Sequence, residues 1–462
     1  MISLSFHGAA GTVTGSKYLL KANDKSILID CGLFQGSREL KERNWSKPAF
    51  NPTDVAAIII THGHIDHIGY LPRLVSLGFN GKIFATPPTV DISAVSLLDT
   101  AKIQEEDAEY RNRKKLTRHA PALPLFTVDD VEQVGKLMSP VQFGSWTHIG
   151  KEFKFRYHVA GHLLGAAGVE IEVNDGNKTI TLLFSGDVGR YGNLLTIDPS
   201  EPPQCNYLIC ESTYGGQMHP VEDPHTILAD LINDVIRRSS ILLIPAFAIG
   251  RTQQIVYLVN DLIIHGRIPP IDIHVDSPMA ITATDIYTKY SSYHRLEAGL
   301  PCGLKGIIEG DHVKLHRTKK SSKSLNDLAG PAIIISSSGM MTGGRIMHHL
   351  LNRLGNPSTT IAVVGFMPEG TLGRKLLDGE KLVYIHKTPI DVQAKIVKIS
   401  SLSGHADYQE LLHWVEPMTT APRTVFLTHG EPPMAAAMAD HLSSVRGWNT
   451  LVPVMDQVVE LN

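Results

Sequence analysis

The chain has 462 residues, more than one compact core normally organises, so two or three domains are expected. Its 43% hydrophobic and 19% charged residues are typical of a globular enzyme and exclude a disordered chain. Lys and Arg total 43 against 46 Asp and Glu, and this net charge of −3 does not indicate a nucleic-acid binder. Histidine is unusually frequent, with 22 copies.

The cysteines form no Cys-x-x-Cys pair and are too few for a disulfide scaffold, which predicts reduced, buried thiols. They are Cys31, Cys205, Cys210 and Cys302. The N-terminus lacks the basic and apolar regions of a signal peptide, and no apolar run reaches the roughly 18 residues of a membrane span. Together these features predict a soluble, cytoplasmic protein with no membrane partner.

The first 85 residues predict short strands separated by glycine turns, at 17–20, 26–30 and 55–61. Helical spacing follows from residue 90 to about 118 and ends in the basic stretch 111–118. Strand patterns return at 154–159, 167–173 and 179–185, with Asp175-Gly-Asn as a hairpin turn.

Near residue 212 the pattern changes from short strands to alternating strands and helices, which indicates an inserted domain. Helices are expected at 227–237, 251–265, 280–290 and 345–354, and strands at 241–245, 271–276, 332–337 and 360–366. This strict alternation predicts a parallel sheet with helices on both faces. Short-strand patterning resumes near 375, so we predict one domain from 1–211 and 375–462 and an inserted domain from 212–374.

The strand predicted at 55–61 ends in His62-Gly-His-Ile-Asp-His67, which packs four metal-capable side chains into six residues. If buried, these polar groups need partners, and a divalent cation supplies them together. His62 and His64 can face one ion while Asp66 and His67 turn toward another. A polar surface turn is the alternative interpretation, but it leaves this density of ligands unexplained.

Two further candidates have the same context, a ligand just past a strand end. His162 follows the strand at 154–159, and Asp187 follows the strand at 179–185. Alone, each is a weak signal, because a glycine-flanked aspartate is more often a turn or cap residue. With the first motif they make a set of imidazoles and carboxylates suited to zinc, with manganese or iron as substitutes.

These residues, with Asp30 at an early strand end, resemble the metallo-β-lactamase superfamily. Three motifs narrow the resemblance to its β-CASP branch of nucleic-acid processors: Glu211 in Ile-Cys-Glu-Ser-Thr-Tyr, His405 in Leu-Ser-Gly-His-Ala-Asp, and His429 in Phe-Leu-Thr-His-Gly-Glu. Supporting signatures lie at 245–253, 337–340 and 369–374. The resemblance covers essentially the whole chain. It implies an α/β fold, an αββα metallo-β-lactamase sandwich with an inserted β-CASP domain built on a mainly parallel sheet flanked by helices.

The branch divides at its third motif, where RNA-directed members carry a histidine and DNA-repair members usually carry an aliphatic residue. His429 therefore implies a ribonuclease, similar to the endonuclease subunit of the pre-mRNA 3′-end processing complex and more distantly to ribonuclease J. From where the chain begins and ends, we expect neither the N-terminal RNA-binding modules of archaeal relatives nor ribonuclease J's additional C-terminal domain.

Carried onto this chain, the resemblance implies two Zn²⁺ ions. His62, His64 and His162 would hold one, and Asp66, His67 and His429 the other. Asp187 would bridge both, which places Asp66 and Asp187 in the catalytic set. A bridging hydroxide would attack a phosphodiester of single-stranded RNA in the interdomain cleft. The site's local charge of about +1 suits a phosphodiester anion, so the whole-chain charge does not exclude RNA.

The resemblance also implies roles around the metals. His405 would be the general acid and Glu211 the carboxylate that orients it, while Asp30 would support the ligand loop. Without the resemblance, a structural role for His405 is equally acceptable. Ser403, Ser338 and Gly339 are expected to contact substrate. The basic stretches 111–118 and 314–323 are read equally well as RNA contacts or as solvated faces.

Several alternatives stay open. The enzyme could be a 5′→3′ exoribonuclease rather than an endonuclease, or a thioester or amide hydrolase of the same superfamily, which the inserted domain disfavours. A catalytically idle scaffold subunit is disfavoured because the chain keeps all its ligands, and a DNA nuclease has low weight. A homodimer is compatible with the class. Met367 stands where many relatives have a polar residue, and it either alters specificity or fills a gap between domains.

Overall fold

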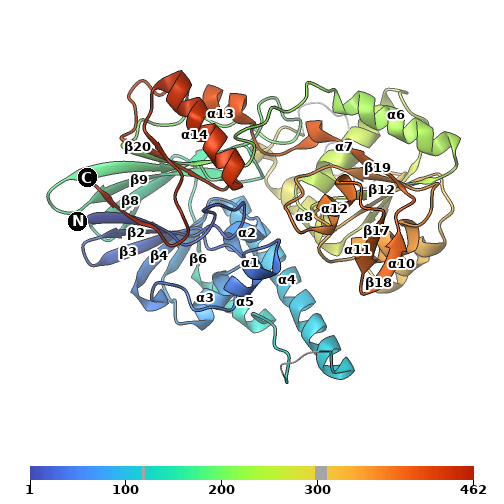
Figure 1. Cartoon of the computed structure of the whole chain (residues 1–462), viewed down its shortest axis with the longest axis horizontal. Helices are drawn as coiled ribbons and strands as arrows, with labels where there is room; N and C mark the ends of the chain where they lie inside the picture. Colours follow the sequence, from blue (N-terminus) through green and yellow to red (C-terminus); the bar gives the residue numbers. More distant parts are fainter. Residues whose placement is uncertain (117–119, 297–309) are drawn as a thin grey trace. The chain divides into compact units, whose positions relative to one another are not determined.

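The computed structural model describes residues 1–116, 120–296 and 310–462, and Arg118 and Cys302 lie outside them. The chain forms two compact units (Figure 1). The first comprises Met1–Met218 and His405–Asn462, and the second comprises His219–Gly404. Residues 375–404 thus group with the second unit by contacts, and the domain boundaries drawn from the sequence stay predictions.

The first unit contains two seven-stranded sheets. One has the order β22-β1-β2-β3-β4-β5-β6. Its strands are β1 (Ile2–Phe6), β2 (Tyr18–Ala22), β3 (Lys25–Ile29), β4 (Val55–Ile59), β5 (Lys82–Ala85), β6 (Met138–Pro140) and β22 (Val458–Leu461). The pairs β3–β4, β4–β5 and β5–β6 are parallel, so these strands end at one edge of the sheet.

The other sheet has the order β21-β20-β11-β10-β9-β8-β7. Its strands are β7 (Thr147–Ile149), β8 (Phe153–Val159), β9 (Ala167–Asn174), β10 (Thr179–Phe184), β11 (Tyr207–Glu211), β20 (Thr424–Thr428) and β21 (Thr450–Leu451). Strand β9 is antiparallel to both β8 and β10, whereas β10, β11 and β20 are parallel. Strands β8, β10, β11 and β20 therefore end at one edge.

Three buried clusters define the layers of the first unit. The inner faces of both sheets form one core, where Ile29 and Ile59 meet Phe184 and Ile209. The outer face of the first sheet packs against α3, α4 and α5, and that of the second packs against α13 and α14. The helices are α1 (Arg38–Arg43), α2 (Ile65–Ile68), α3 (Leu71–Ser76), α4 (Pro87–Lys114), α5 (Val128–Leu137), α13 (Tyr408–Val415) and α14 (Pro432–Arg446). The expected αββα sandwich is confirmed.

The second unit is built on a six-stranded parallel sheet of order β14-β13-β15-β12-β16-β19. Its strands are β12 (Ile241–Pro245), β13 (Asp272–Asp276), β14 (Val313–Leu315), β15 (Ala332–Ser336), β16 (Thr360–Val363) and β19 (Lys395–Lys398), with a separate hairpin of β17 (Leu382–Ile385) and β18 (Thr388–Asp391). Its helices are α6 (Pro224–Arg237), α7 (Arg251–Ile264), α8 (Pro278–Lys289), α10 (Lys319–Lys323), α11 (Ile346–Arg353) and α12 (Leu372–Leu377). The parallel sheet predicted from strand–helix alternation is confirmed.

Two helices, α13 and α14, lie in the region that was predicted to contain short strands. Both carry start signals: Asp407 and Glu410 form a capping box before α13, and Pro432 opens α14. The predicted hairpin turn at Asp175 does join β9 to β10. Of the cysteines described, all three are free and buried. Across the described residues, every helix is too short or too polar to cross a membrane.

Candidate metal centre

The predicted ligands come together at the ends of strands in the first unit. His62 follows β4, and His64 precedes α2, which carries Asp66 and His67. Further ligands come from the other sheet: His162 lies between β8 and β9, Asp187 follows β10 and His429 follows β20. Because these strands end at one edge of the sandwich, ligands from segments far apart in sequence converge there.

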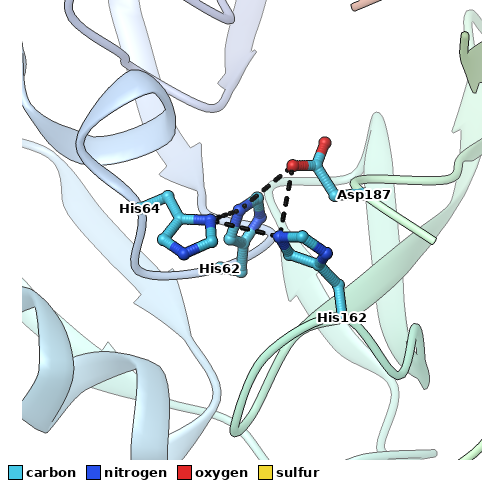
Figure 2. Close-up of side chains that lie close together, drawn as sticks. All are labelled: His62, His64, His162 and Asp187. Carbon is cyan, nitrogen blue, oxygen red and sulfur yellow. Dashed lines mark hydrogen bonds and ion pairs between the residues drawn. The ribbon is translucent and has the colours of Figure 1, made fainter. Parts of the chain in front are cut away.

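One group of potential ligands consists of His62, His64, His162 and Asp187, whose ligand atoms all lie within 4.8 Å of one another. Figure 2 shows the three imidazoles and the carboxylate facing one another. The Nδ1 atom of His64 lies 3.0 Å from Nε2 of His62 and 3.2 Å from Nε2 of His162. Asp187 Oδ2 lies 3.4 Å from the His62 nitrogen and 3.7 Å from the His162 nitrogen.

Asp66, His67 and His429 form a second group, also within 4.8 Å of one another. The Nε2 atoms of His67 and His429 are 3.3 Å apart, and the His429 nitrogen is 3.5 Å from Asp66 Oδ2. Asp187 adjoins this group too, because its Oδ1 lies 3.5 Å from His67 Nε2. Asp187 thus turns one carboxylate oxygen to each group, which is the position expected of a bridging ligand.

The residues present fit divalent cations. Oδ1 of Asp187 is buried and has no hydrogen-bond partner among the described residues. A buried, unpaired carboxylate oxygen is costly unless a cation meets it. The donor set around it, imidazole nitrogens and carboxylate oxygens, is the set that zinc and similar transition metals prefer.

Asp30 and Thr61 fix the orientation of the His67 and His62 imidazoles through hydrogen bonds to their Nδ1 atoms. Asp30 accepts hydrogen bonds from His67 Nδ1 at 2.7 Å, from Thr61 N at 2.8 Å and from Thr61 Oγ1 at 2.9 Å. Thr61 Oγ1 also lies 3.1 Å from His62 Nδ1 and can accept its proton. With the Nδ1 atoms engaged in this way, the Nε2 lone pairs of His62 and His67 face the ligand groups.

Thr213 orients the imidazole of His429, the ligand that follows β20 of the other sheet. Its Oγ1 donates to the backbone carbonyl of His429 at 3.0 Å and lies 3.1 Å from Nδ1 of the same residue. A hydroxyl that has donated its proton can accept one from Nδ1, which leaves Nε2 of His429 free to bind a cation. Neither Thr61 nor Thr213 was predicted from the sequence, although each is adjacent to or within a recognised motif.

Two glycines allow the ligand loop to sit this close to its neighbours. A Cβ on Gly63 would collide with Ile92 Cγ2, and one on Gly32 would collide with the carbonyl oxygen of Asp66. Because neither neighbour leaves room for a Cβ, a side chain at either position would displace the loop that carries His62 to His67.

Protonation of the site follows burial and charge. Burial lowers the pKa of His64 to about 4 and that of His62 well below its usual value, so both are neutral, as metal binding requires. Burial would also lower the pKa of His67, but the charges of Asp187 and Asp30 raise it. The pKa of Asp66 falls to about 2 because the His429 hydrogen bond and the nearby imidazoles outweigh burial.

His405 lies beside the ligand groups and is held by Glu211, at the end of β11. Its Nδ1 is 3.2 Å from Glu211 Oε2 and 3.9 Å from Asp187 Oδ2. Glu211 is itself fixed, since its Oε1 accepts the Val188 N–H at 2.6 Å. Burial would lower the pKa of His405, but the charge and hydrogen bond of Glu211 outweigh it and raise the pKa to about 9. The structure brings together the pair that the sequence motifs singled out.

The remaining predicted residues belong to the second unit. Ser403 is buried two residues before His405, and its N–H donates to Ser400 O. Ser338 Oγ accepts the N–H of Thr342 at 3.1 Å, and Gly339 lies against Phe247. The substrate contacts of Ser403, Ser338 and Gly339 stay predictions.

Met367 is buried in the core of the second unit, where it packs against Gly373. The basic stretch 314–323 is partly engaged within the second unit. Lys314 forms an ion pair with Asp272, and residues 319–323 form α10. In the other basic stretch, 111–118, residues 117 and 118 lie outside the described part of the chain.

Three family profiles match successive parts of the chain. Residues 10–88 match the metallo-β-lactamase superfamily, residues 252–376 match the β-CASP domain, and residues 389–453 match the Zn-dependent metallo-hydrolase RNA specificity domain. A protein of Thermus thermophilus named as a ribonuclease is 33% identical, over 95% of this chain and 95% of its own length. This chain belongs to the β-CASP family of metallo-β-lactamase proteins. As a β-CASP protein it is a metal-dependent hydrolase, and its His/Asp clusters support divalent metal binding.

Two further relatives align with nearly the whole of this chain. An RNase J-like protein of Methanocaldococcus jannaschii is 28% identical over 100% of both chains. The transcription termination factor FttA of the same organism is 29% identical over 98% of this chain and 70% of its own length. A crystal structure of a protein of unknown function from Enterococcus faecalis covers 100% of both chains with a TM-score of 0.53 at 14% identity, which shows a shared fold.

Proposed function

We propose that this β-CASP protein is a zinc-dependent ribonuclease that cleaves single-stranded RNA internally. One observation carries the proposal: Asp187 belongs to one group of potential metal ligands and lies 3.5 Å from His67 of the other, and the imidazole of His405 lies 3.9 Å from the same carboxylate. Ligands for two cations beside a proton donor make a constellation suited to hydrolysing a phosphodiester.

Two Zn²⁺ ions, with Mn²⁺ or Fe as substitutes, fit the two ligand groups. His62, His64 and His162 would hold one, Asp66, His67 and His429 the other, and Asp187 would contact both. When bound, such a pair lowers the pKa of water toward ~7 and neutralises charge on a phosphoryl oxygen. The protein supplies the orientation of the ligands through Asp30, Thr61 and Thr213.

His405 would donate the proton that the leaving sugar oxygen needs. Glu211 stabilises its protonated form from 3.2 Å, which keeps the proton available at neutral pH. Glu211 accepts the Val188 N–H at 2.6 Å and bonds the His405 ring, so we assign to it the orientation of His405. Glu211 is therefore a positioning residue, and His405 is the residue proposed to contact the reacting atoms.

RNA is favoured as the substrate by the third motif and by the relatives. His429 is the histidine that RNA-directed members of the branch carry, and it lies in the segment that matches the RNA specificity domain. The relatives named as a ribonuclease and as an RNase J-like protein span nearly the whole chain. A small-molecule hydrolase of the same superfamily is the alternative, and turnover of a thioester without cleavage of RNA would favour it.

Cleavage of end-labelled oligonucleotides tests the proposal. A 5′-labelled RNA, with and without a 5′-monophosphate, and a DNA of the same sequence are incubated with the protein in zinc, with and without chelator. We expect internal RNA fragments in the same yield with and without the 5′-monophosphate. We also expect little cleavage of DNA and no product in the presence of chelator. Mononucleotides released only from a 5′-monophosphate would instead indicate a 5′→3′ exonuclease, and chelator-resistant cleavage would contradict the metal mechanism.

A further inference from the structure

Helix α4 ends in an arm whose outer face has no role in the proposed reaction. The helix runs from Pro87 to Lys114, and its far half extends past α3 and α5 (Figure 1). Ala101 and Ala108 are buried on its inner face. On the opposite face, two turns apart, Ile103 is 48% exposed and Tyr110 is 47% exposed.

The arm is held in place rather than loosely attached. Asn112 bonds the returning chain through both its amide atoms, donating to Ala122 O at 2.9 Å and accepting from Ala122 N at 2.7 Å. Gln104 accepts from Leu125 N at 2.9 Å. These bonds fix the inner face against residues 122–125, so the outer face has a fixed direction and a fixed pattern of side chains.

Charges on this outer face are segregated about Tyr110. Glu106 and Asp107 lie one turn before it, and Arg113 and Lys114 lie one turn after it. Each acid has a base seven residues later, on the same side of the helix. A second helix running antiparallel, with a two-fold axis at Tyr110, would set Glu106 opposite Arg113 of the second copy and Asp107 opposite Lys114 of the second copy.

We propose that the outer face of α4 docks on α4 of a second copy of this chain. The pattern is self-complementary. Each acidic residue of one copy lies opposite a basic residue of the other, which gives four ion pairs about the two-fold axis, and the exposed Tyr110 rings meet at that axis. Within one copy, Asp107 pairs with Arg111 at 2.9 Å on the surface, a contact too weak to prevent a new one.

Charge argues for a second copy over a nucleic acid at this face. Its four charges, Glu106, Asp107, Arg113 and Lys114, cancel, and the acidic half would repel a phosphate backbone that the basic half attracts.

The contact is small, a few turns of one helix from each copy, against the roughly 1,200–2,000 Å² of a standard interface. We therefore expect a weak dimer whose population depends on protein concentration.

Sedimentation equilibrium of the full-length, zinc-loaded protein between micromolar and several hundred micromolar tests the proposal with two charge variants. Glu106→Lys with Asp107→Lys makes the face entirely basic, and Arg113→Glu with Lys114→Glu makes it entirely acidic. Each variant alone should dimerise at least about 30-fold more weakly, because every pair becomes repulsive. Mixed together, the two should form a heterodimer, and a chain carrying all four changes should dimerise like the wild type.

A matched control reverses two exposed acids elsewhere in the same unit, Glu39→Lys with Glu42→Lys on α1, and should dimerise normally. The recovery on mixing cannot arise from misfolding. A wild-type protein that stays monomeric throughout, or variants that dimerise as well as the wild type, would overturn the proposal. So would variants that bind an RNA oligonucleotide differently while the mass stays that of a monomer, which would assign the face to nucleic acid.

Discussion

Histidines and an aspartate gather at strand ends in both units, but only one of these clusters is built for metal. In the first unit, Asp187 meets imidazoles from two ligand groups and keeps a buried oxygen without a hydrogen-bond partner among the described residues. In the second unit, Asp276 ends β13 and accepts from Arg345, His349 and Ser322, each at 2.7 Å. The guanidinium of Arg345 neutralises Asp276, whereas the neighbours of Asp187 are imidazoles that can bind a metal.

The contrast shows that a density of metal-capable residues does not by itself define a metal site. Arg345 also donates to the carbonyl of His316, so the second cluster ties loops together. His274 and His316 bond to each other at 2.9 Å, and His349 is committed to Asp276. What distinguishes a centre is a buried carboxylate with no permanent cation of its own, surrounded by imidazoles whose far nitrogens are held by other groups.

The largest expected difference comes from removing one carboxylate charge in each cluster. Asp187→Asn should lower the bound zinc and reduce RNA cleavage by about three orders of magnitude or more, because both ligand groups lose a shared ligand. Asp276→Asn should leave zinc content unchanged and lower the free energy of unfolding by about 3 kcal/mol, since Arg345 and His349 lose their buried partner. Metal analysis and denaturant unfolding of both variants measure this, and zinc loss in Asp276→Asn would erase the distinction.

A histidine from each cluster gives the next largest effect. His405→Ala should keep the zinc and the fold but reduce kcat roughly 10²–10⁴-fold, the usual contribution of a general acid. His349→Ala serves as the control, since it removes a buried imidazole bonded to Asp276 and should leave kcat unchanged. Single-turnover cleavage under saturating protein separates the two, and full activity in His405→Ala would remove the proposed proton donor.

The pH dependence sharpens the role of Glu211. A general acid must carry its proton, so the rate should fall as pH rises through the pKa of His405, about 9 in the metal-free protein and lower beside bound cations. Glu211→Gln removes the charge that raises this pKa and should move the alkaline limb about one unit or more toward lower pH. A pH–rate profile of wild type and variant at saturating zinc measures the shift, and an unmoved limb would make Glu211 merely structural.

The smallest effect is a pH dependence of stability in the second unit. Burial and the neighbouring His316 lower the pKa of His274 from 6.5 to about 4. The unfolded chain then binds more protons than the folded one between these values, so the free energy of unfolding falls as pH drops through that window. His274→Gln keeps a donor for His316 and should lessen the loss. Hydrogen exchange of second-unit peptides at pH 7 and pH 5 checks this, and equal acid sensitivity in the variant would contradict it.

The sequence motifs predicted most of the metal-ligand residues, because these residues directly follow strands. The end of a strand places the next side chains at the edge of the sheet. His62 to His67, His162 and Asp187 could be placed in this way, and the alternating strands and helices predicted the parallel sheet of the second unit. Thr61 and Thr213 could not be found, since a hydroxyl that holds an imidazole depends on which segments meet in space. Helices α13 and α14 were missed because their start signals lay in a region read for strands.

The most direct test asks whether His405 supplies a proton to the leaving oxygen. An RNA whose leaving sugar oxygen is replaced by sulfur at the cleavage site needs no such proton, because a thiolate leaves unaided. We predict that His405→Ala, far slower than wild type on the oxygen substrate, cleaves the sulfur substrate within about tenfold of the wild-type rate. A variant equally impaired on both substrates would contradict the assignment of His405 as the general acid.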